Sequence, residues 1–119
     1  MTLEERKAQV RSYLGKVLRI VIDRPIGYIH KKTIHFPINY GYIPGVLGGD
    51  GEELDVYLLG VTEPVTEYNC HVIGIVHRKN DVEDKLIAAP EGITYTAEEM
   101  AEAIHFQEKY YDTYIEVLK

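Results

Sequence analysis

The sequence predicts a mostly β fold of the α+β class, in which a small closed barrel carries a helix near each end of the chain. Apolar runs rich in β-branched residues recur along the chain, and such runs are typical of buried strands. Two segments begin with a helix-capping pattern. Closing the strands into a barrel would remove the exposed edges that an open sheet leaves.

The N-terminal helix is predicted from its cap and from the spacing of its apolar residues. Thr2 and Glu5 have the form of a capping box, and Leu3, Val10 and Leu14 fall on one helical face. This helix either covers one side of the domain or docks on a second subunit, and the sequence leaves both interpretations open.

The strands are predicted where apolar and β-branched residues dominate. Residues 25–51 are dense in Gly, Pro, Tyr and Asn instead, which indicates short strand pieces and the ordered turns of a binding loop. The clearer strands are predicted at residues 17–22, 54–60, 70–78, 85–89 and 114–118.

The C-terminal helix opens with a second capping box, Thr96 with Glu99, and is predicted to run to about Asp112. No internal repeat, low-complexity tract or domain boundary interrupts the sequence, so we expect residues 1–119 to form a single domain. The apolar face of this helix carries three large side chains: Met100, Ile104 and Tyr111.

Composition excludes several function classes. The formal net charge of −6 argues against a nucleic-acid binder, which needs a basic face. A negative protein still binds a polyanion when divalent metal ions lie between its carboxylates and the ligand.

The single Cys70 lies in an apolar run and is expected to be a buried hydrophobe. Without an apolar run long enough for a membrane, and with a charged start, the chain is expected to be soluble and cytoplasmic.

A cluster of carboxylates is the most informative feature. Four acidic residues fall within positions 50–55, next to a turn rich in glycine, and Asp55 begins an apolar strand. Hard divalent cations such as Mg²⁺ prefer oxygen ligands, and glycines let the backbone turn several carboxylates inward. Composition by itself leaves a solvated acidic turn as an equal alternative to a metal site.

Longer motifs decide between these alternatives. Residues 39–43 read N-Y-G-Y-I and residues 50–55 read D-G-E-E-L-D. Together they resemble the N-Y-G-Y-I segment and the D-G-D-P-x-D signature of the family I inorganic pyrophosphatases. Residues 85–90, K-L-I-A-A-P, are similar to a strand of that family. His105, Phe106 and Tyr110 match residues on the family's C-terminal helix.

The resemblance implies an OB-like closed five-stranded β-barrel, with the N-terminal and C-terminal helices packed on it. It also implies an enzyme, an inorganic diphosphatase that hydrolyses pyrophosphate to two phosphates with a metal-activated water. The expected cofactor is Mg²⁺, two or more ions per site, with Mn²⁺ as an alternative. We expect pyrophosphate as the small-molecule partner, a homo-oligomer, and neither nucleic acid nor membrane as a partner.

The resemblance also assigns roles to residues. Glu52 takes the place of the aspartate that polarises the attacking water, and Asp55 is placed to bridge two metal ions. The expected catalytic residues are Glu52, Asp55, Tyr40 and Lys85. The expected phosphate ligands are Arg19, Tyr40, Lys85 and Tyr110. The expected metal ligands are Asp50, Asp55, Asp81 and either Glu83 or Asp84.

The chain departs from the family pattern at several positions. Val21 stands where an acidic ligand is expected, and Tyr111 stands where a lysine is expected. The hairpin before residue 39 is short and lacks the family's arginine, for which Lys31, Lys32 or Arg24 are possible substitutes, while Arg78 and Lys79 are further sources of positive charge. Two alternatives therefore stay open: hydrolysis of another phosphoanhydride, and a non-catalytic domain that binds metal or phosphate.

Overall fold

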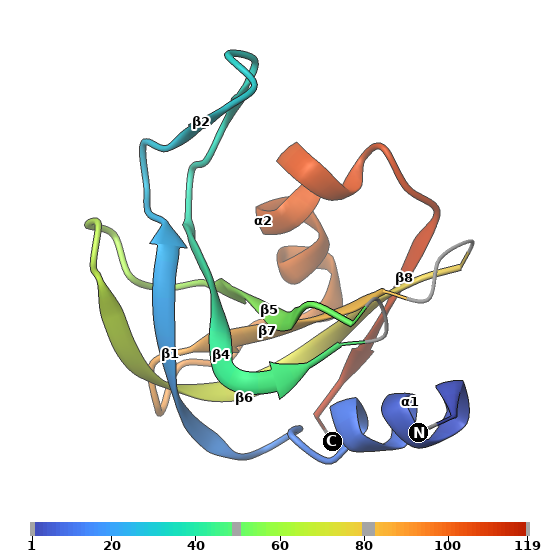
Figure 1. The fold of residues 1–119 in the computed structure, drawn as a ribbon. Helices are drawn as coiled ribbons and strands as arrows, with labels where there is room; N and C mark the ends of the chain where they lie inside the picture. Colours follow the sequence, from blue (N-terminus) through green and yellow to red (C-terminus); the bar gives the residue numbers. More distant parts are fainter. Residues whose placement is uncertain (1, 49–50, 80–82, 119) are drawn as a thin grey trace.

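The computed structural model describes residues 2–48, 51–79 and 83–118 (Figure 1). Its sheet runs in the order β1-β4-β5-β7-β6, and β6 pairs back with β1, so these strands close into a barrel. All neighbouring strands are antiparallel except β5 and β7, which are parallel. The closed five-stranded barrel predicted above is confirmed, although its fifth strand is β4, from the segment expected to hold short strand pieces, and not the strand near residues 114–118. The strands are β1 (Val17–Arg24), β4 (Asn39–Leu47), β5 (Glu53–Leu58), β6 (Glu67–Arg78) and β7 (Asp84–Ala89).

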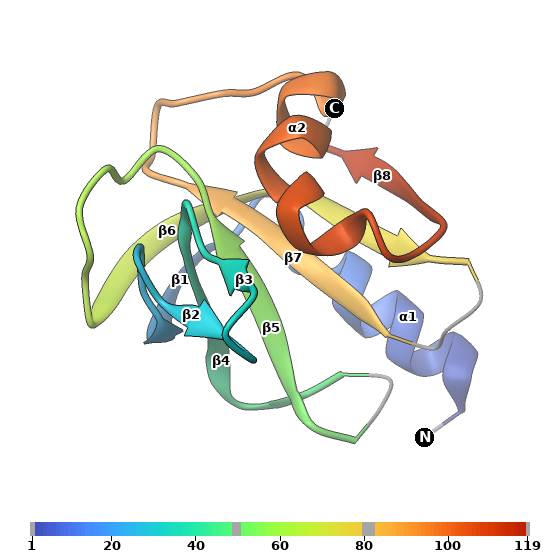
Figure 2. The same ribbon diagram turned by 90° about the horizontal axis from the view of Figure 1, so that it is seen from above.

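The remaining elements surround the barrel, as the second view shows (Figure 2). A small hairpin, β2–β3, projects between β1 and β4. The helix α2 packs on the sheet on the same side as that hairpin. The last strand extends the sheet beyond the barrel, because it pairs with the second half of β6. These elements are α1 (Leu3–Arg11), β2 (Ile29–His30), β3 (Ile34–His35), α2 (Ala97–Glu108) and β8 (Thr113–Val117).

Both predicted capping boxes are formed, by Thr2 with Glu5 and by Thr96 with Glu99. α1 nevertheless ends at Arg11, before Leu14 of its predicted apolar face, and α2 ends at Glu108, before the predicted Asp112. Placing Tyr111 on the apolar face of the C-terminal helix was therefore wrong. Its backbone N–H closes a turn onto the Glu108 carbonyl, and the side chain is exposed.

The central strands are apolar on both faces because both faces are covered. Val56 and Leu86 point into the barrel, whereas Tyr57 and Ile87, their neighbours along the strands, pack beneath α2 with Met100. This double burial explains why these strands read as continuous apolar runs instead of alternating ones.

Two sequence details have clear structural roles. Cys70 is buried in the barrel, as expected, and burial raises the pKa of its thiol to about 12. Gly41, inside the N-Y-G-Y-I segment, lies opposite Ile22 of β1, and a Cβ there would approach the Val21 carbonyl oxygen to 1.9 Å. Only glycine permits this approach of β4 to β1. No helix in the described ranges is long and apolar enough to cross a membrane.

Candidate active site

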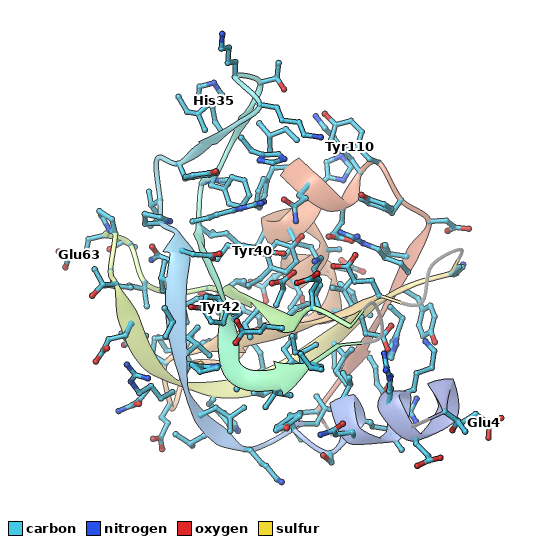
Figure 3. All side chains as sticks on the ribbon, in the orientation of Figure 1. Glu4, His35, Tyr40, Tyr42, Glu63 and Tyr110 are labelled. Atoms are coloured by element: carbon cyan, nitrogen blue, oxygen red, sulfur yellow. The ribbon has the colours of Figure 1, made fainter. Side chains whose placement is uncertain are left out.

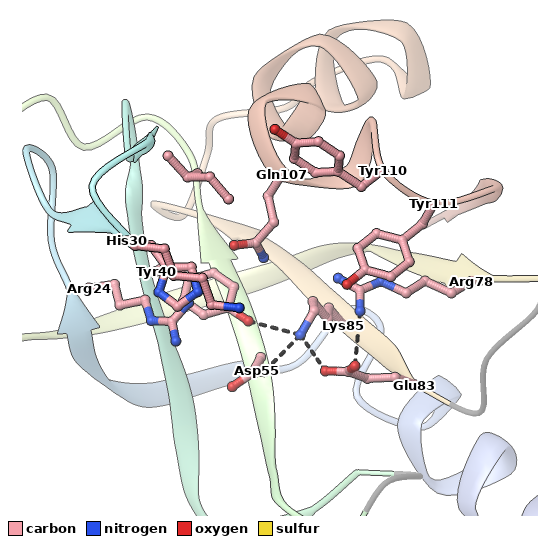
Figure 4. A pocket seen from close by; sticks show the side chains of 12 residues that line it. Arg24, His30, Tyr40, Asp55, Arg78, Glu83, Lys85, Gln107, Tyr110 and Tyr111 are labelled. Carbon is pink, nitrogen blue, oxygen red and sulfur yellow. Dashed lines mark hydrogen bonds and ion pairs between the residues drawn. The ribbon is translucent and has the colours of Figure 1, made fainter.

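A cavity of about 310 Å³ opens on the outer face of the barrel, between the β2–β3 hairpin and the C-terminal end of α2 (Figure 4). Its walls carry more positive than negative charge, although the whole chain is negative. An anion is therefore the ligand that this cavity favours. The charged lining residues are the cations Arg24, Lys31, Arg78 and Lys85 and the carboxylates Asp55 and Glu83.

Lys85 is the centre of the wall that the barrel supplies. Its Nζ lies 2.8 Å from Asp55 Oδ2, 2.5 Å from Glu83 Oε1 and 2.9 Å from the Tyr40 hydroxyl. The register of the parallel strands explains part of this arrangement. Val56 pairs with Leu86, both pointing inward, so the preceding residues Asp55 and Lys85 both point outward into the cavity.

The electrostatics of this wall keep Lys85 charged and Tyr40 neutral. Burial by itself lowers the pKa of the Lys85 ammonium, but Tyr40, Asp55 and Glu83 outweigh that effect, so the pKa is raised. Burial raises the pKa of the Tyr40 hydroxyl, which the nearby ammonium only partly offsets. Lys85 is thus a fixed positive charge, and Tyr40 keeps its proton as a hydrogen-bond donor.

Arg78 lies beside this group and is held from behind by Glu108 of α2. Its Nε donates to Glu108 Oε1 at 3.0 Å and its Nη2 to Oε2 at 2.8 Å, while Nη1 donates to Glu83 at 2.9 Å. Burial opposes the charge, but the Glu108 hydrogen bonds raise the pKa of Arg78. The ring of Tyr111 covers the guanidinium, because its centroid lies 3.6 Å from the Arg78 Cζ. The Tyr57 hydroxyl also donates to Glu108.

The hairpin side supplies a different wall, built from Arg24 at the end of β1 and from His30 and Lys31. The Arg24 Cζ lies 5.6 to 5.7 Å from the ring centroids of Tyr28, Phe36 and Tyr40. Its guanidinium is therefore held by aromatic rings. Of the suggested substitutes for the family's arginine, Arg24 and Lys31 line the cavity and Lys32 does not.

Five of the residues expected at the site come together around this cavity. Tyr40 lies in the interior, and Tyr110 lies on the rim with its side chain exposed (Figure 3). Of the two alternatives in the second acidic cluster, Glu83 lines the cavity. Asp84 faces the other way, where it is buried beside His77. The expected site residues that line the cavity are Tyr40, Asp55, Glu83, Lys85 and Tyr110.

Two further expected site residues, Arg19 and Glu52, do not line the cavity. Arg19 is exposed on β1 and pairs with Glu67 of β6 at 2.6 Å, so the structure does not bring it to the cavity. Glu52 is exposed in the turn before β5 and does not line the cavity. Asp50 and Asp81 lie outside the described residues. Within residues 2–48, 51–79 and 83–118, no group of three or more His, Cys, Asp or Glu side chains is arranged to hold a metal ion.

Glu108 was missed at the sequence level, although a signal for it exists. It lies four residues after Ile104 and eight after Met100, on the same buried face of α2. A charged residue on an apolar helix face indicates a buried partner of opposite charge. Arg78 is that partner, and it is distant in sequence.

The sequence profile described as "Inorganic pyrophosphatase" matches residues 6–116, which is nearly the whole chain. The chain belongs to the inorganic pyrophosphatase family. Among curated relatives, the "Inorganic pyrophosphatase" of Aquifex pyrophilus is 30% identical over 86 residues, which cover 64% of this chain and 48% of that protein. The one from Rickettsia conorii is 27% identical over 109 residues, covering 76% and 63% respectively. The chain thus spans about half the length of the curated relatives that it matches.

Solved structures of pyrophosphatases share the fold. The inorganic pyrophosphatase of Ehrlichia chaffeensis superposes with a TM-score of 0.67 at 17% identity, covering 87% of both chains. A pyrophosphatase structure from Coxiella burnetii gives a TM-score of 0.61 at 20% identity, covering 87% of this chain and 84% of that one. At these identities the likeness establishes the OB-like barrel fold and not the chemistry.

Proposed function

We propose that the protein hydrolyses inorganic pyrophosphate to two phosphates with the help of a divalent metal ion, Mg²⁺ or Mn²⁺. The observation that carries the proposal is the cavity itself: a net positive pocket in a negative chain, with two carboxylates among its cations. Cations bind the anionic substrate, and carboxylates are the ligands that hard metals prefer.

Two carboxylates of the cavity, Asp55 and Glu83, are candidate ligands for a metal ion. Asp55 Oδ2 and Glu83 Oε1 both contact the Lys85 ammonium, so two carboxylates already converge on one positive charge. Asp55 and Glu83 would hold the ion, and Asp50 and Asp81 are proposed as additional ligands. A bound ion would supply a water of lowered pKa and would neutralise charge on the phosphates.

The side chains of the barrel wall have separate roles in this proposal. Lys85 contributes a permanent positive charge against the leaving phosphate, because its pKa is raised. Tyr40 donates a hydrogen bond to a phosphate oxygen, because its raised pKa keeps it protonated. Tyr110 reaches a phosphate from the rim. No covalent intermediate is needed, since positioning and charge stabilisation account for most catalysis of phosphoryl transfer.

Phosphate release from pyrophosphate in the presence of Mg²⁺ tests this function. Asp55→Asn should abolish turnover, because it removes a carboxylate that would hold the metal. Glu53→Gln is the matched control: it lies on the same strand, is exposed, and keeps an acceptor for the Gly45 N–H. The proposal fails if wild-type protein releases no phosphate, or if Asp55→Asn retains wild-type turnover.

A second candidate keeps the chemistry and changes the substrate. The cavity is rimmed by the partly exposed rings of Tyr110 and Tyr111, which offer stacking surface that pyrophosphate does not use. This favours a phosphoanhydride that carries an organic group. Turnover of nucleoside di- or triphosphates without turnover of pyrophosphate would support this candidate against the first.

A further inference from the structure

The strand β8 ends the sheet on one side, and Figure 2 shows it at a margin of the molecule. Among the described strands it pairs with β6 alone, in a register without a bulge. An edge strand of this kind exposes backbone N–H and C=O groups to which another strand can bind. Proline, lysine and bulges usually block such pairing, and β8 contains none of them.

The pairing with β6 determines which backbone groups of β8 point to the open edge. The Leu118 N–H donates to the Ile73 carbonyl at 3.0 Å, and the Lys79 N–H donates to the Asp112 carbonyl at 2.8 Å. In an antiparallel ladder every second residue bonds the neighbouring strand, so the even-numbered residues of β8 bond β6. The residues whose N–H and C=O groups point outward are Thr113, Ile115 and Val117.

This edge is complementary to itself. When two antiparallel copies of β8 are centred on Ile115, that residue faces Ile115 of the second copy, and Thr113 faces Val117 of the second copy. Every outward N–H and C=O group of both strands then has a hydrogen-bonding partner. Any other antiparallel register leaves some of these groups unpaired. In the described chain, no backbone hydrogen bond outside the β6–β8 ladder uses them.

The side chains agree with the same register. Tyr114 faces Glu116 of the second copy, in the type of pair whose side chains lie closest, and no like charges are opposed. Tyr114 is 50% exposed, and its ring is stacked on His77 with centroids 4.6 Å apart. On the α2 side, a cavity of about 280 Å³ includes Thr113 and Ile115 in its lining. This cavity leaves room beside the edge for apolar side chains of the second strand.

We propose that β8 pairs with β8 of a second copy of this chain, antiparallel and centred on Ile115, so that two barrels share one continuous sheet. A two-fold axis makes such an interface contact itself, which is why a self-complementary strand selects a second copy over an unrelated strand. The proposal does not depend on the proposed function, because no residue of β8 lines the active-site cavity.

Mass in solution and amide hydrogen exchange test the pairing on the unmodified chain. Light scattering should give about twice the 13.6 kDa of one chain. The amides of Thr113, Ile115 and Val117 should be more protected at high than at low protein concentration. Those of Tyr114 and Glu116 should be protected at both, because they bond β6. A monomer at all concentrations, or an oligomer in which the odd-numbered amides exchange freely, refutes the proposal.

Two substitutions at one exposed position should act in opposite directions. Tyr114→Glu places a carboxylate opposite Glu116 of the second copy at both ends of the pair, and it should weaken the dimer about tenfold. Tyr114→Lys places an ammonium opposite the same carboxylate and should strengthen the dimer. Sedimentation measures both dissociation constants, and circular dichroism verifies that each variant is folded.

Ile93→Glu is the control for net charge, because it adds the same charge at another exposed apolar residue, outside β8. It should dissociate like wild type. The proposal is overturned if both Tyr114 variants change the dissociation constant in the same direction, or if Ile93→Glu weakens the dimer as much as Tyr114→Glu. Should a Tyr114 variant fail to fold, the exchange pattern of the wild-type amides decides by itself.

Discussion

The two walls of the cavity carry similar positive charge but hold it in opposite ways. On the barrel wall, Lys85 and Arg78 are 4% and 6% exposed and lie within networks of carboxylates. On the hairpin wall, Arg24 is held by aromatic rings and Lys31 by the turn. Buried charges need partners to offset desolvation, whereas partly exposed ones do not. Removing one partner on the barrel wall should therefore destabilise the fold, whereas the cations of the hairpin wall have no carboxylate partner to lose within the described residues.

The largest effect should come from breaking the buried pair. Glu108→Ala leaves the Arg78 guanidinium and the Tyr57 hydroxyl without their shared acceptor, which should lower the free energy of unfolding by about 3 kcal/mol. Chemical denaturation measures this change. Glu102→Ala, on the exposed face of the same helix, should stay within about 0.5 kcal/mol. If both variants lost the same free energy of unfolding, the buried pair would not stabilise the fold more than an exposed residue does.

Metal should act on the barrel wall and not on the hairpin wall. Mg²⁺ at about 100 times its dissociation constant should raise the free energy of unfolding by about 2.7 kcal/mol, because it binds the folded protein. Asp55→Asn should lose this gain, and Arg24→Gln should keep it. A gain in wild type that survives Asp55→Asn would show that the ion binds elsewhere.

The carboxylate network behind the barrel wall should make stability depend on pH. His77 lies between Asp84 and Glu116, with ring nitrogens 3.1 and 3.0 Å from their oxygens, although its Nδ1 lacks the angle of a good hydrogen bond to Asp84. Asp84 first, and then Glu116, raise the His77 pKa above its ordinary 6.5 against the effect of burial. The folded state thus binds this proton more tightly than the unfolded state.

The sign of the pH effect follows from that raised pKa. The contribution of His77 to the free energy of unfolding should be complete below pH 6.5 and should be lost as the pH rises through the folded-state pKa. Denaturation at a series of pH values measures the slope. His77→Gln should lack this part of the slope, and His105→Gln, exposed on α2, should keep it. An identical pH profile for His77→Gln and wild type would contradict the assignment.

The smallest effect concerns the turn of the hairpin wall. Glycine relieves the left-handed strain at Lys31 or Lys32 but gains entropy in the unfolded chain, so each Lys→Gly variant should gain less than about 1 kcal/mol of stability. Thermal unfolding of both variants checks this expectation. A loss of about 2 kcal/mol or more in the free energy of unfolding of Lys31→Gly would mean that the Lys31 side chain stabilises the fold.

The strands and helix caps were predictable because they depend on local sequence. Runs of β-branched residues became strands β1, β5, β6 and β7 with small changes at their ends, and both capping boxes formed as expected. Helix ends were less predictable, because the spacing of apolar residues continues past the point where the chain turns. Tyr111 fits the helical period but packs on Arg78 from a turn.

The choice between Glu83 and Asp84 was within reach of the sequence. Side chains alternate along a strand, so Glu83 shares a face with Lys85 and Asp84 does not. The pairing of Arg19 was out of reach, because Glu67 reaches it only after β6 closes the barrel against β1. A cation on a strand has the same local pattern whether it binds a phosphate or a neighbouring carboxylate.

By itself, the sequence determined the closed barrel, its flanking helices, the family and a core group of residues around Asp55 and Lys85, because each depends on local pattern or motif. Only the tertiary structure decided which charges are already paired. Arg78 and Arg24 look alike in sequence, yet one meets Glu108 of a distant helix and the other meets aromatic rings. Long-range packing sets these partners, and the partners decide which cations remain to bind a ligand.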